Sequence, residues 1–478
     1  MLLPRRLCIA IRIAVVGTTA CRDLRPLFRN PDAHSDSPRA PLSRRGHQRP
    51  ETAARGRREA RVANLRRVQV SEIVEITGHL MDSGVLARVL DDVLDYGGDY
   101  TIEKLDVGKT HEDESSARIV VMAESDDDLQ RLLMRLQTHG VNQVDPGDAM
   151  TRPAPADGVF PEDFYSTTNL ETVVRLGTHW VPVEHPEMDC GLRVVGNRVH
   201  TVPVSDVKAD DRIVCGAGGV KVVLPPREHK ALGEPHFEFM ASTVSSEKPQ
   251  ALLVRQIAER MREVKGEGGR ILWVAGPAVV HTGASTPMAA LVENGWVDVL
   301  FSGNALATHD IESSLFGTSL GVDLAHGAGV EHGHEHHIRA INTIRAAGSI
   351  KTAVDNGTLT SGVMHAMVKA GRPFVLVGSV RDDGPLPDVY TDVIEGQRAM
   401  RAQLDGVGYA IMVATMLHSI ATGNILPASI PLVAVDINPA TVTKLADRGS
   451  AQALGIATDI GLFLEQLALE LVPGYSRD

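Results

Sequence analysis

The fold of this chain is decided by two stretches, PFVLVGSVRDDGPLPD (Pro373–Asp388) and PLVAVDINPATVTKLADRGS (Pro431–Ser450), because each opens with a short apolar run. The runs, Phe374–Val377 and Leu432–Val435, are rich in valine and leucine and are followed by turn-forming residues. Strands that are buried on both faces of a parallel sheet have this composition. The two stretches therefore predict strands of a parallel α/β sheet.

Asp436 follows the second run at the point where the strand is expected to end. In open α/β sheets, ligands bind in the crevice outside the carboxyl ends of the strands, where an acid accepts hydrogen bonds from an adenosine ribose. The same carboxylate would repel the 2′-phosphate of NADP. The position therefore favours NAD, although the sequence contains no GxGxxG fingerprint.

Charge is unevenly distributed along the 478 residues. Residues 1–68 contain 16 arginines and 5 acids, whereas the remainder holds 32 basic and 55 acidic residues, a balance of −23. The Arg-rich start has no sustained apolar periodicity, so we predict a disordered extension. The acidic remainder argues against nucleic acid or an anionic membrane as a partner. An aromatic content of 4% argues against stacking platforms for single-stranded nucleic acid.

The cysteines and the apolar runs indicate a cytoplasmic protein without a membrane segment. Cys190 and Cys215 lie in the expected folded sequence and neither belongs to a CxxC pair, which is a reducing-compartment pattern. The start of the chain imitates a secretory signal, but Arg12 interrupts its apolar run. We therefore favour a disordered extension or translated upstream sequence there. No apolar run is long enough to cross a bilayer.

Changes in periodicity divide the folded sequence into three regions. Residues 69–150 show the order βαββαβ, which is typical of a ferredoxin-like α+β unit. Residues 151–248 contain short β runs separated by turn signals and predict a small β-rich subdomain. In residues 249–478 helices alternate with buried strands, one of them assigned to VDVLFSGNAL (Val297–Leu306). This alternation predicts a doubly wound parallel sheet, so the chain is expected to be an α/β protein.

Six motifs distributed over these regions belong together: EITGHLMDSGVLARVLD (75–91), FEFMASTVSSEKPQ (237–250), GNALATHDIESSLFGTSLGVD (303–323), GSVRDDGPLPD (378–388), ATMLHSIATGN (414–424) and VDINPATVTKLADRGS (435–450). Together they resemble the archaeal and bacterial NAD-dependent ornithine cyclodeaminases that carry the LOR/SDH bifunctional-enzyme conserved region. The chain is also similar to the C-terminal part of cyanobacterial arginine dihydrolase/ornithine cyclodeaminase fusions. The resemblance runs from Val70 to Leu471 and leaves no counterpart for the arginine dihydrolase domain.

The resemblance implies a fold, a cofactor and an activity. The C-terminal domain should be similar to the nucleotide-binding fold of deoxyhypusine synthase and should hold NAD. The enzyme should convert L-ornithine to L-proline and ammonia. Carried over motif by motif, the resemblance implies contacts with the dinucleotide from Asn304, Ala305, Asp383, Thr415, Met416, Leu417, His418, Asp436, Asp459 and Ile460.

The implied reaction needs a hydride to leave the ornithine α-carbon and later return, which is chemistry that bound NAD supplies. The protein must add an anchor for the α-carboxylate and groups that move protons at the two amines. Arg381 is a candidate anchor because a guanidinium can bind a carboxylate through two hydrogen bonds. Asp382 and Asp383 are adjacent carboxylates whose mutual repulsion would raise one pKa, and Lys248 is a further candidate anchor or base. The alternatives are that Asp382 caps a turn and that Lys248 is an exposed surface residue.

The histidine run HGHEHH (His332–His337) raises the question of a metal site. His332 and His336 would share one helix face, but a glycine between them weakens a helix and the spacing fixes no further ligand. The implied reaction needs no metal, so we predict none, and substrate contacts or a solvated helix start are the alternatives. Cys190 and Cys215 have no base fixed nearby and are expected to be small buried side chains.

Three other functions remain open at this point. One is a transferase similar to deoxyhypusine synthase, in which a second nucleophile captures the imine. Another is a lysine–oxoglutarate reductase or saccharopine dehydrogenase, which would turn over NAD(P)H stoichiometrically. A third is an amino-acid sensor that retains NAD without catalysis. Cyclodeamination differs from all of them because it releases ammonia without net NADH. We also expect a homo-oligomer, although the sequence does not fix the subunit number.

Overall fold

The structure is a computed structural model, and it describes residues 70–80, 84–110, 113–224, 244–245, 250–324, 333–382, 384–448 and 453–476. The predicted disordered extension of residues 1–68 lies outside the described residues, and so do Lys248 and Asp383. None of the helices in the described part is both long and apolar enough to span a bilayer.

The first folded unit is a four-stranded antiparallel sheet with two helices. Its elements are β1 (Val70–Gly78), α1 (Val85–Asp95), β2 (Asp99–Asp106), β3 (Ser115–Ala123), α2 (Asp126–Gln137) and β4 (Asn142–Gln143). Alternate residues of β1, Val74 and Ile76, are buried against Val85, Val89 and Val93 of α1, which recur at helical spacing. The chain order βαββαβ with strand order β2-β3-β1-β4 confirms the predicted ferredoxin-like unit.

The second unit is β-rich, as predicted. Its seven strands are β5 (Met150–Pro153), β6 (Glu171–Leu176), β7 (His179–Glu184), β8 (Gly191–Val195), β9 (Arg198–Val202), β10 (Arg212–Cys215) and β11 (Val220–Val223). The sheet is mixed because β7 and β9 pair in parallel. Cys190 and Cys215 are buried free thiols, and burial is the first cause that raises the pKa of each, to about 11 for Cys215. Both cysteines are therefore the small buried side chains that the sequence predicts.

The third unit contains an eight-stranded sheet in the order β12-β21-β20-β19-β13-β14-β17-β18. Its strands are β12 (Val244–Ser245), β13 (Arg270–Ala275), β14 (Val299–Gly303), β17 (Phe374–Val377), β18 (Val389–Tyr390), β19 (Val407–Val413), β20 (Leu432–Asp436) and β21 (Ala453–Ala457). Every pair in this sheet is parallel. From β13 the chain proceeds to β14, β17 and β18 on one side and then returns to β19, β20 and β21 on the other. The predicted doubly wound fold is confirmed, with its switch point between β13 and β19.

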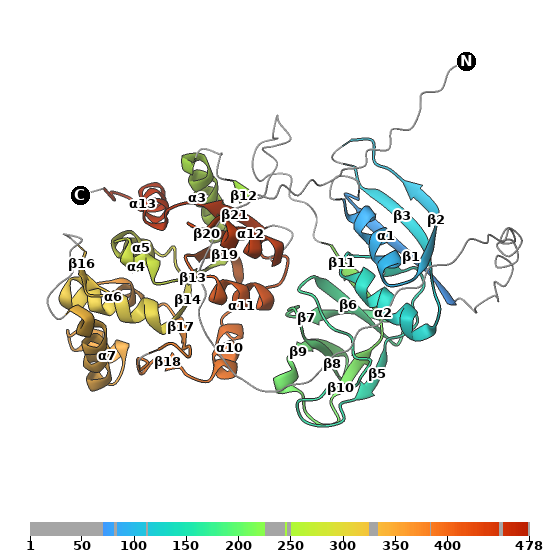
Figure 1. Cartoon of the computed structure of the whole chain (residues 1–478), viewed down its shortest axis with the longest axis horizontal. Helices are drawn as coiled ribbons and strands as arrows, with labels where there is room; N and C mark the ends of the chain where they lie inside the picture. The colour runs from blue at the N-terminus through green and yellow to red at the C-terminus, as the bar shows by residue number, and fades with distance from the viewer. Residues whose placement is uncertain are drawn as a thin grey trace, which may run out of the picture. The chain divides into compact units, whose positions relative to one another are not determined.

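Helices cover both faces of this sheet (Figure 1). Ile271 and Trp273 of β13 pack in one core, and the alternate residues Leu272 and Val274 pack in the other. The first face is covered by α3 (Gln250–Gly266), α5 (Ser285–Glu293), α6 (Asn304–Phe316), α7 (His336–Ala347), α8 (Ile350–Asp355), α9 (Val363–Lys369) and α13 (Ile460–Leu471). The second is covered by α10 (Val393–Arg401) and α11 (Leu417–Ile425), with α12 (Pro439–Arg448) beside α11.

The strand predicted for Val297–Leu306 is wrong at its C-terminal end. β14 stops at Gly303, and α6 begins at Asn304 without a loop between them. The sequence gives little sign of α6 because the helix carries buried polar residues, among them Asp310 and Glu312, both with no exposed surface. These groups disrupt the apolar stripe by which an amphipathic helix is recognised.

The carboxylate of Asp310 is buried because it caps another helix. Its carboxylate accepts hydrogen bonds from the backbone amides of Val363 (2.9 Å) and Met364 (2.8 Å), the first residues of α9. Burial raises the pKa of Asp310 to about 6, against the opposing effect of these two amides. The carboxyl thus replaces a local cap for α9, whose N-cap residue, Gly362, has no side chain to provide one.

We expect Asp310→Asn to lower the free energy of unfolding by about 1 kcal/mol, because a capping acceptor is weakened. The folded-state pKa lies above the unfolded value, so the stability contributed by protonating Asp310 is complete below about pH 4 and is lost as the pH rises through about 6. The variant should lack this part of the pH dependence. Urea unfolding of both proteins at several pH values measures it, and parallel curves would contradict the assignment.

Candidate active site

Those predicted cofactor residues that the structure describes lie along the carboxyl edge of the eight-stranded sheet. Because the strands are parallel, all of their carboxyl ends lie along this edge. Asn304 and Ala305 follow β14, Thr415 to His418 follow β19, Asp436 ends β20, and Asp459 and Ile460 follow β21. The edge is where ligands of doubly wound folds bind.

The loops after β13 and β19 cross at van der Waals distance at the switch point. The Gly276 amide donates to the Val413 carbonyl at 2.9 Å. A Cβ at Gly276 would lie 2.0 Å from the Ala414 carbonyl oxygen and 3.0 Å from Thr415 Cβ. Ala414 itself has a φ of 53°, an uncommon conformation for a residue with a side chain. Only glycine at position 276 therefore allows the two loops to approach this closely.

Two helices begin at this edge without a side-chain cap. α11 starts after Met416 and α6 starts after Gly303, and neither N-cap residue provides a side-chain hydrogen bond. Their first amides therefore lack side-chain acceptors at the positive ends of the helices, where anions bind. Ser419, in the first turn of α11, has a buried hydroxyl with no hydrogen-bond partner among the described residues. The close contact between Gly276 and the loop after β19, called the Gly276 crossing below, lies beside these amides. Together they fit the diphosphate of a dinucleotide.

His418 connects three of the strand ends. A Cβ at Gly303 would lie 3.0 Å from its Cε1, so the ring packs directly against the end of β14. Burial lowers the pKa of His418, while a hydrogen bond with the Val377 backbone and the charge of Asp382 oppose the shift. Asn304 is buried, and its Oδ1 accepts from the Leu386 amide at 3.0 Å, which ties the start of α6 to the loop after β17.

Asp436 and Asp459, two of the predicted cofactor contacts, both accept hydrogen bonds from backbone amides. Asp436 Oδ1 accepts from the Asn438 amide at 2.8 Å, which forms a turn at the strand end. Asp459 is the N-cap of α13 and accepts from the Leu462 amide at 2.9 Å, whereas Ile460 is buried. Asp436 stands at the position of the acid that binds ribose in dinucleotide folds.

The structure describes two of the catalytic candidates from the sequence, Arg381 and Asp382, which lie in the turn after β17. Asp382 accepts from the Ser379 amide at 2.8 Å, which is the turn-capping alternative. Arg381 has an exposed side chain, and its own amide donates to Ser379 Oγ. Lys248 and Asp383 lie outside the described residues.

His332 lies outside the described residues, and the structure describes the rest of the histidine run. Gly333–Glu335 is a single 3₁₀ turn and α7 begins at His336, so His336 stands at a helix start, which was one of the alternatives. His336 Nδ1 lies 2.8 Å from Thr318 Oγ1. Within the described part of the chain, no group of three His, Cys, Asp or Glu side chains is arranged to hold a metal ion.

Three residues that the sequence reasoning missed do form a cluster. His309 Nδ1 lies 2.8 Å from Glu312 Oε2 on α6, and the His309 ring lies 4.9 Å from that of His281, measured between centroids. His281 ends α4 (Ala278–His281), the short helix directly after β13. The i, i+3 spacing of His309 and Glu312 was a detectable signal, since such residues share a helix face.

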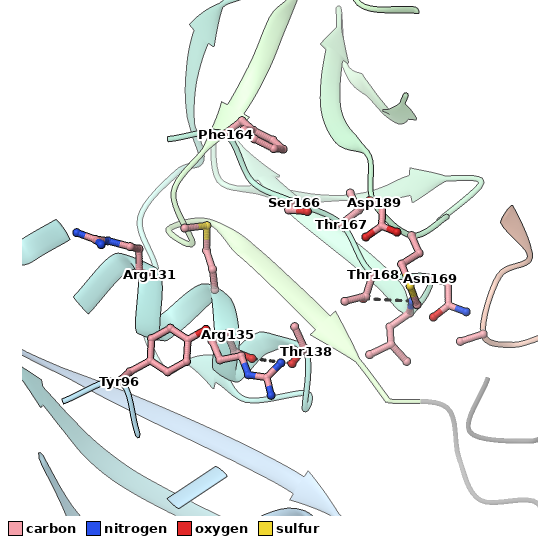
Figure 2. A pocket seen from close by; sticks show the side chains of 14 residues that line it. Tyr96, Arg131, Arg135, Thr138, Phe164, Ser166, Thr167, Thr168, Asn169 and Asp189 are labelled. Carbon is pink, nitrogen blue, oxygen red and sulfur yellow. Dashed lines mark hydrogen bonds between the residues drawn. The ribbon is translucent and has the colours of Figure 1, made fainter. Parts of the chain in front are cut away.

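A separate pocket of about 770 Å³ lies away from the predicted site residues, none of which lines it. Figure 2 shows Tyr96, Arg131 and Arg135 on one wall, facing Thr167 and Asp189 on the other. Arg135 is already paired with Asp92 at 2.8 Å.

The fold and the carboxyl edge define a doubly wound, dinucleotide-binding α/β protein. The model described as the LOR/SDH bifunctional enzyme conserved region matches residues 71–170. Two models of the C-terminal part of ArgZ-like arginine dihydrolases, the first region and the Rossmann fold, match residues 171–254 and 255–467.

Similar proteins agree with these matches. The ornithine cyclodeaminase of Methanothermobacter thermautotrophicus is 51% identical over 401 residues, covering 83% of this chain and 97% of the relative. The bifunctional arginine dihydrolase/ornithine cyclodeaminase AgrE of Nostoc sp. is 40% identical over 84% of this chain, which spans 58% of that longer protein.

Two solved structures share the fold. Apo ArgZ, a cyanobacterial arginine dihydrolase, has a TM-score of 0.73 at 35% identity, and the match covers 84% of this chain and 58% of that one. A putative LOR/SDH protein of Methanococcus maripaludis has a TM-score of 0.63 at 44% identity, over 68% of this chain and 97% of that one. The chain belongs to the ornithine cyclodeaminase family that carries the LOR/SDH conserved region, as the motifs predict.

Proposed function

We propose that this protein is an NAD-dependent ornithine cyclodeaminase that converts L-ornithine to L-proline and ammonia. The observation that carries the proposal is the switch point, where the Gly276 crossing and the uncapped start of α11 make a cradle for a diphosphate. Family membership supplies the substrate, because relatives that match almost over their full length are ornithine cyclodeaminases.

Bound NAD supplies a hydride acceptor that can later return the hydride to the substrate. The chain's own tasks are to hold the dinucleotide across the switch point and to keep the substrate α-carbon beside it. The amides of α11 and α6 bind the diphosphate, and Asp436 accepts from the adenosine ribose. His418, packed against Gly303, closes the floor between β14 and β19.

The predicted contacts from Ala305, Asp383, Asp459 and Ile460 remain part of this proposal, as do Arg381, Asp382 and Lys248 as candidates for binding or acid–base work. Asp382 is supported as an electrostatic neighbour of His418. We also propose a cytoplasmic homo-oligomer that acts on a small molecule without nucleic acid, with an acidic body as the support. We also propose domain boundaries after residues 68, 150 and 248, from the same changes in periodicity that divide the sequence into regions.

The test follows an isotope through the reaction. Purified protein is incubated with L-ornithine deuterated at the α-carbon, and proline, ammonia and NADH absorbance are measured together. We expect proline that retains deuterium at C2, equimolar ammonia and no net NADH, because the same hydride leaves and returns. Net NADH would indicate an oxidoreductase instead, and no proline without an added second nucleophile would indicate a transferase.

A further inference from the structure

The sheet is a circular permutation of the ordinary dinucleotide-binding order. In the usual strand order 3-2-1-4-5-6 the acid that binds ribose ends strand 2 and the dinucleotide crosses between strands 1 and 4. Here β21-β20-β19-β13-β14-β17 occupy those positions, and Asp436 ends β20. A dinucleotide with its adenosine at β20 would have its nicotinamide half over the ends of β13 and β14. The elements that follow these two strands are α4 and α6.

These two elements bring His281 and His309 together beside that half of the site. His309 lies five residues into α6, about 7 Å along the helix from its start at the end of β14. His281 lies on the short α4 that follows β13. Thr282, the next residue, has its Oγ1 3.4 Å from where a Cβ of Gly461 would stand, in the first turn of α13. The end of α4, which carries His281, is therefore close to the first turn of α13 as well as to the carboxyl end of β13.

A buried carboxylate fixes the second histidine of the pair. Glu312 has no exposed surface and accepts from His309 Nδ1 (2.8 Å), Thr318 Oγ1 (2.9 Å) and the Gly321 amide (3.0 Å). Burial acts to raise the pKa of Glu312, but these hydrogen bonds outweigh it and hold the pKa below its ordinary value. An ionised Glu312 requires a proton on His309 Nδ1, which leaves Nε2 as an acceptor.

The first histidine, His281, contacts the hairpin that carries Thr318 and Gly321, in which β15 (Thr318–Ser319) pairs with β16 (Val322–Asp323). His281 Nδ1 lies 2.7 Å from Ser319 Oγ, in β15, the strand that Glu312 secures through Thr318. Burial and the adjacent His309 lower the pKa of His281, and the charge of Glu312 opposes this. The charged and titratable groups around His281 come from three helices. They are His309 and Glu312 from α6, His336 and His337 from α7, and Asp459 at the start of α13.

We propose that His281 is the group that takes the proton from the substrate α-ammonium, with His309 and Glu312 as its positioning residues. This inference rests on the proposed cyclodeaminase function. It is carried by the place of the His281–His309 pair after β13 and β14 and by the buried carboxylate that orients it. The ligand class at this subsite is a primary alkylammonium group.

The proton transfer balances as follows. An N–H bond of the α-ammonium breaks and its proton passes to His281 Nε2. With NAD bound, the freed lone pair would form the C=N bond as the α-carbon gives up its hydride. The δ-ammonium gives one proton to solvent and attacks this carbon, and the new ring nitrogen gives a second proton to solvent. The protonated His281 then returns its proton to the departing nitrogen, which leaves as ammonia while the lone pair of the ring nitrogen forms a new C=N bond. Return of the hydride to this bond would give proline. Each proton that the His281 imidazole accepts is thus released within the same catalytic cycle.

The first test replaces His281. We expect His281→Gln to lower kcat by about 10²-fold or more, as for loss of a general base, with melting temperature and the Kd for NAD unchanged. His281→Ala should behave likewise and recover part of its turnover with added imidazole. A merely structural role predicts no rescue. A His281→Gln enzyme within about twofold of wild-type kcat would overturn the proposal.

The second test uses Glu312→Gln and its matched control, Asp310→Asn. Both residues are buried carboxylates on α6 that accept backbone amides, but only Glu312 contacts a histidine. Losing the Glu312 charge lowers the pKa of His281, so the acid limb of kcat/KM should move to lower pH in Glu312→Gln and stay in place in Asp310→Asn. Equal movement in both variants would overturn the positioning role.

Measurements on the wild-type protein distinguish a failure of this inference from a failure of the proposed function on which it rests. If wild-type protein forms no proline from ornithine, the proposed function fails, and His281 has no assigned reaction. If the wild type forms proline but His281→Gln does so equally well, only the assignment of His281 fails. Binding of NAD, measured by calorimetry on each variant, shows that the dinucleotide site is intact in every comparison.

Discussion

Gly276→Ala is expected to lower turnover by about 10²-fold or more and the free energy of unfolding by about 1–3 kcal/mol. The new Cβ would stand 2.0 Å from the Ala414 carbonyl oxygen, and a backbone atom cannot move aside as a flexible side chain can. The loop from Ala414 to Met416 must therefore shift, and it carries the start of α11 with it. NAD affinity from calorimetry and melting temperature are measured on the same protein.

Gly423→Ala is the matched control because Gly423 lies within α11 itself. A Cβ there meets no atom within 4 Å, so the alanine should leave NAD binding unchanged and stabilise the helix by about 0.5–1 kcal/mol. If Gly276→Ala binds NAD as tightly as Gly423→Ala does, the crossing of the two loops does not form the dinucleotide site.

Replacing Asp436 should separate its electrostatic role from its structural one. Asp436→Ala removes both the ribose acceptor and the turn bond to the Asn438 amide, and we expect NAD to bind about 10- to 100-fold more weakly. Asp436→Asn keeps the turn, since an amide oxygen also accepts from Asn438, but it loses the charge. This variant should therefore lose part of the preference for NAD over NADP, measured as the ratio of the two dissociation constants.

Asp392 provides the control for Asp436. It caps α10 by accepting from the amides of Ile394 (2.8 Å) and Glu395 (3.3 Å), and it has no part in the proposed site. Asp392→Asn should leave both dissociation constants unchanged. If Asp436→Asn keeps the wild-type ratio of the NAD and NADP dissociation constants, Asp436 only stabilises its turn. If protein purified from cells contains mainly NADP, the ribose contact assigned to Asp436 is excluded as well.

Much of the fold was predictable because its signals are local. The apolar runs that became β17 and β20 stand out against their polar flanks, and the alternation in β1 and the spacing in α1 identify the ferredoxin-like unit. The edge that carries Asp436 follows from the same reasoning, because parallel strands deliver their carboxyl ends to one side. The family motifs predicted further cofactor contacts, and those that the structure describes follow β14, β19 and β21.

The catalytic candidates were harder to predict because sequence proximity does not show what a side chain faces. Asp382 was a candidate acid, yet its carboxylate accepts from Ser379 in its own turn. α6 was absent from the prediction because its buried polar residues conceal the apolar stripe. His309 and Glu312 are separated by one helical turn, but nothing local indicates that His281 lies against them.

The sequence by itself determined the parallel sheet, the ferredoxin-like unit and the family, since periodicity, strand-end residues and motifs are written along the chain. The tertiary structure alone decided which polar groups meet. The pKa of the buried Glu312 is held below its ordinary value because Thr318 and Gly321, on the hairpin after α6, donate to it together with His309. A buried charge needs several donors at once, and donors from separate elements converge only after the chain has packed.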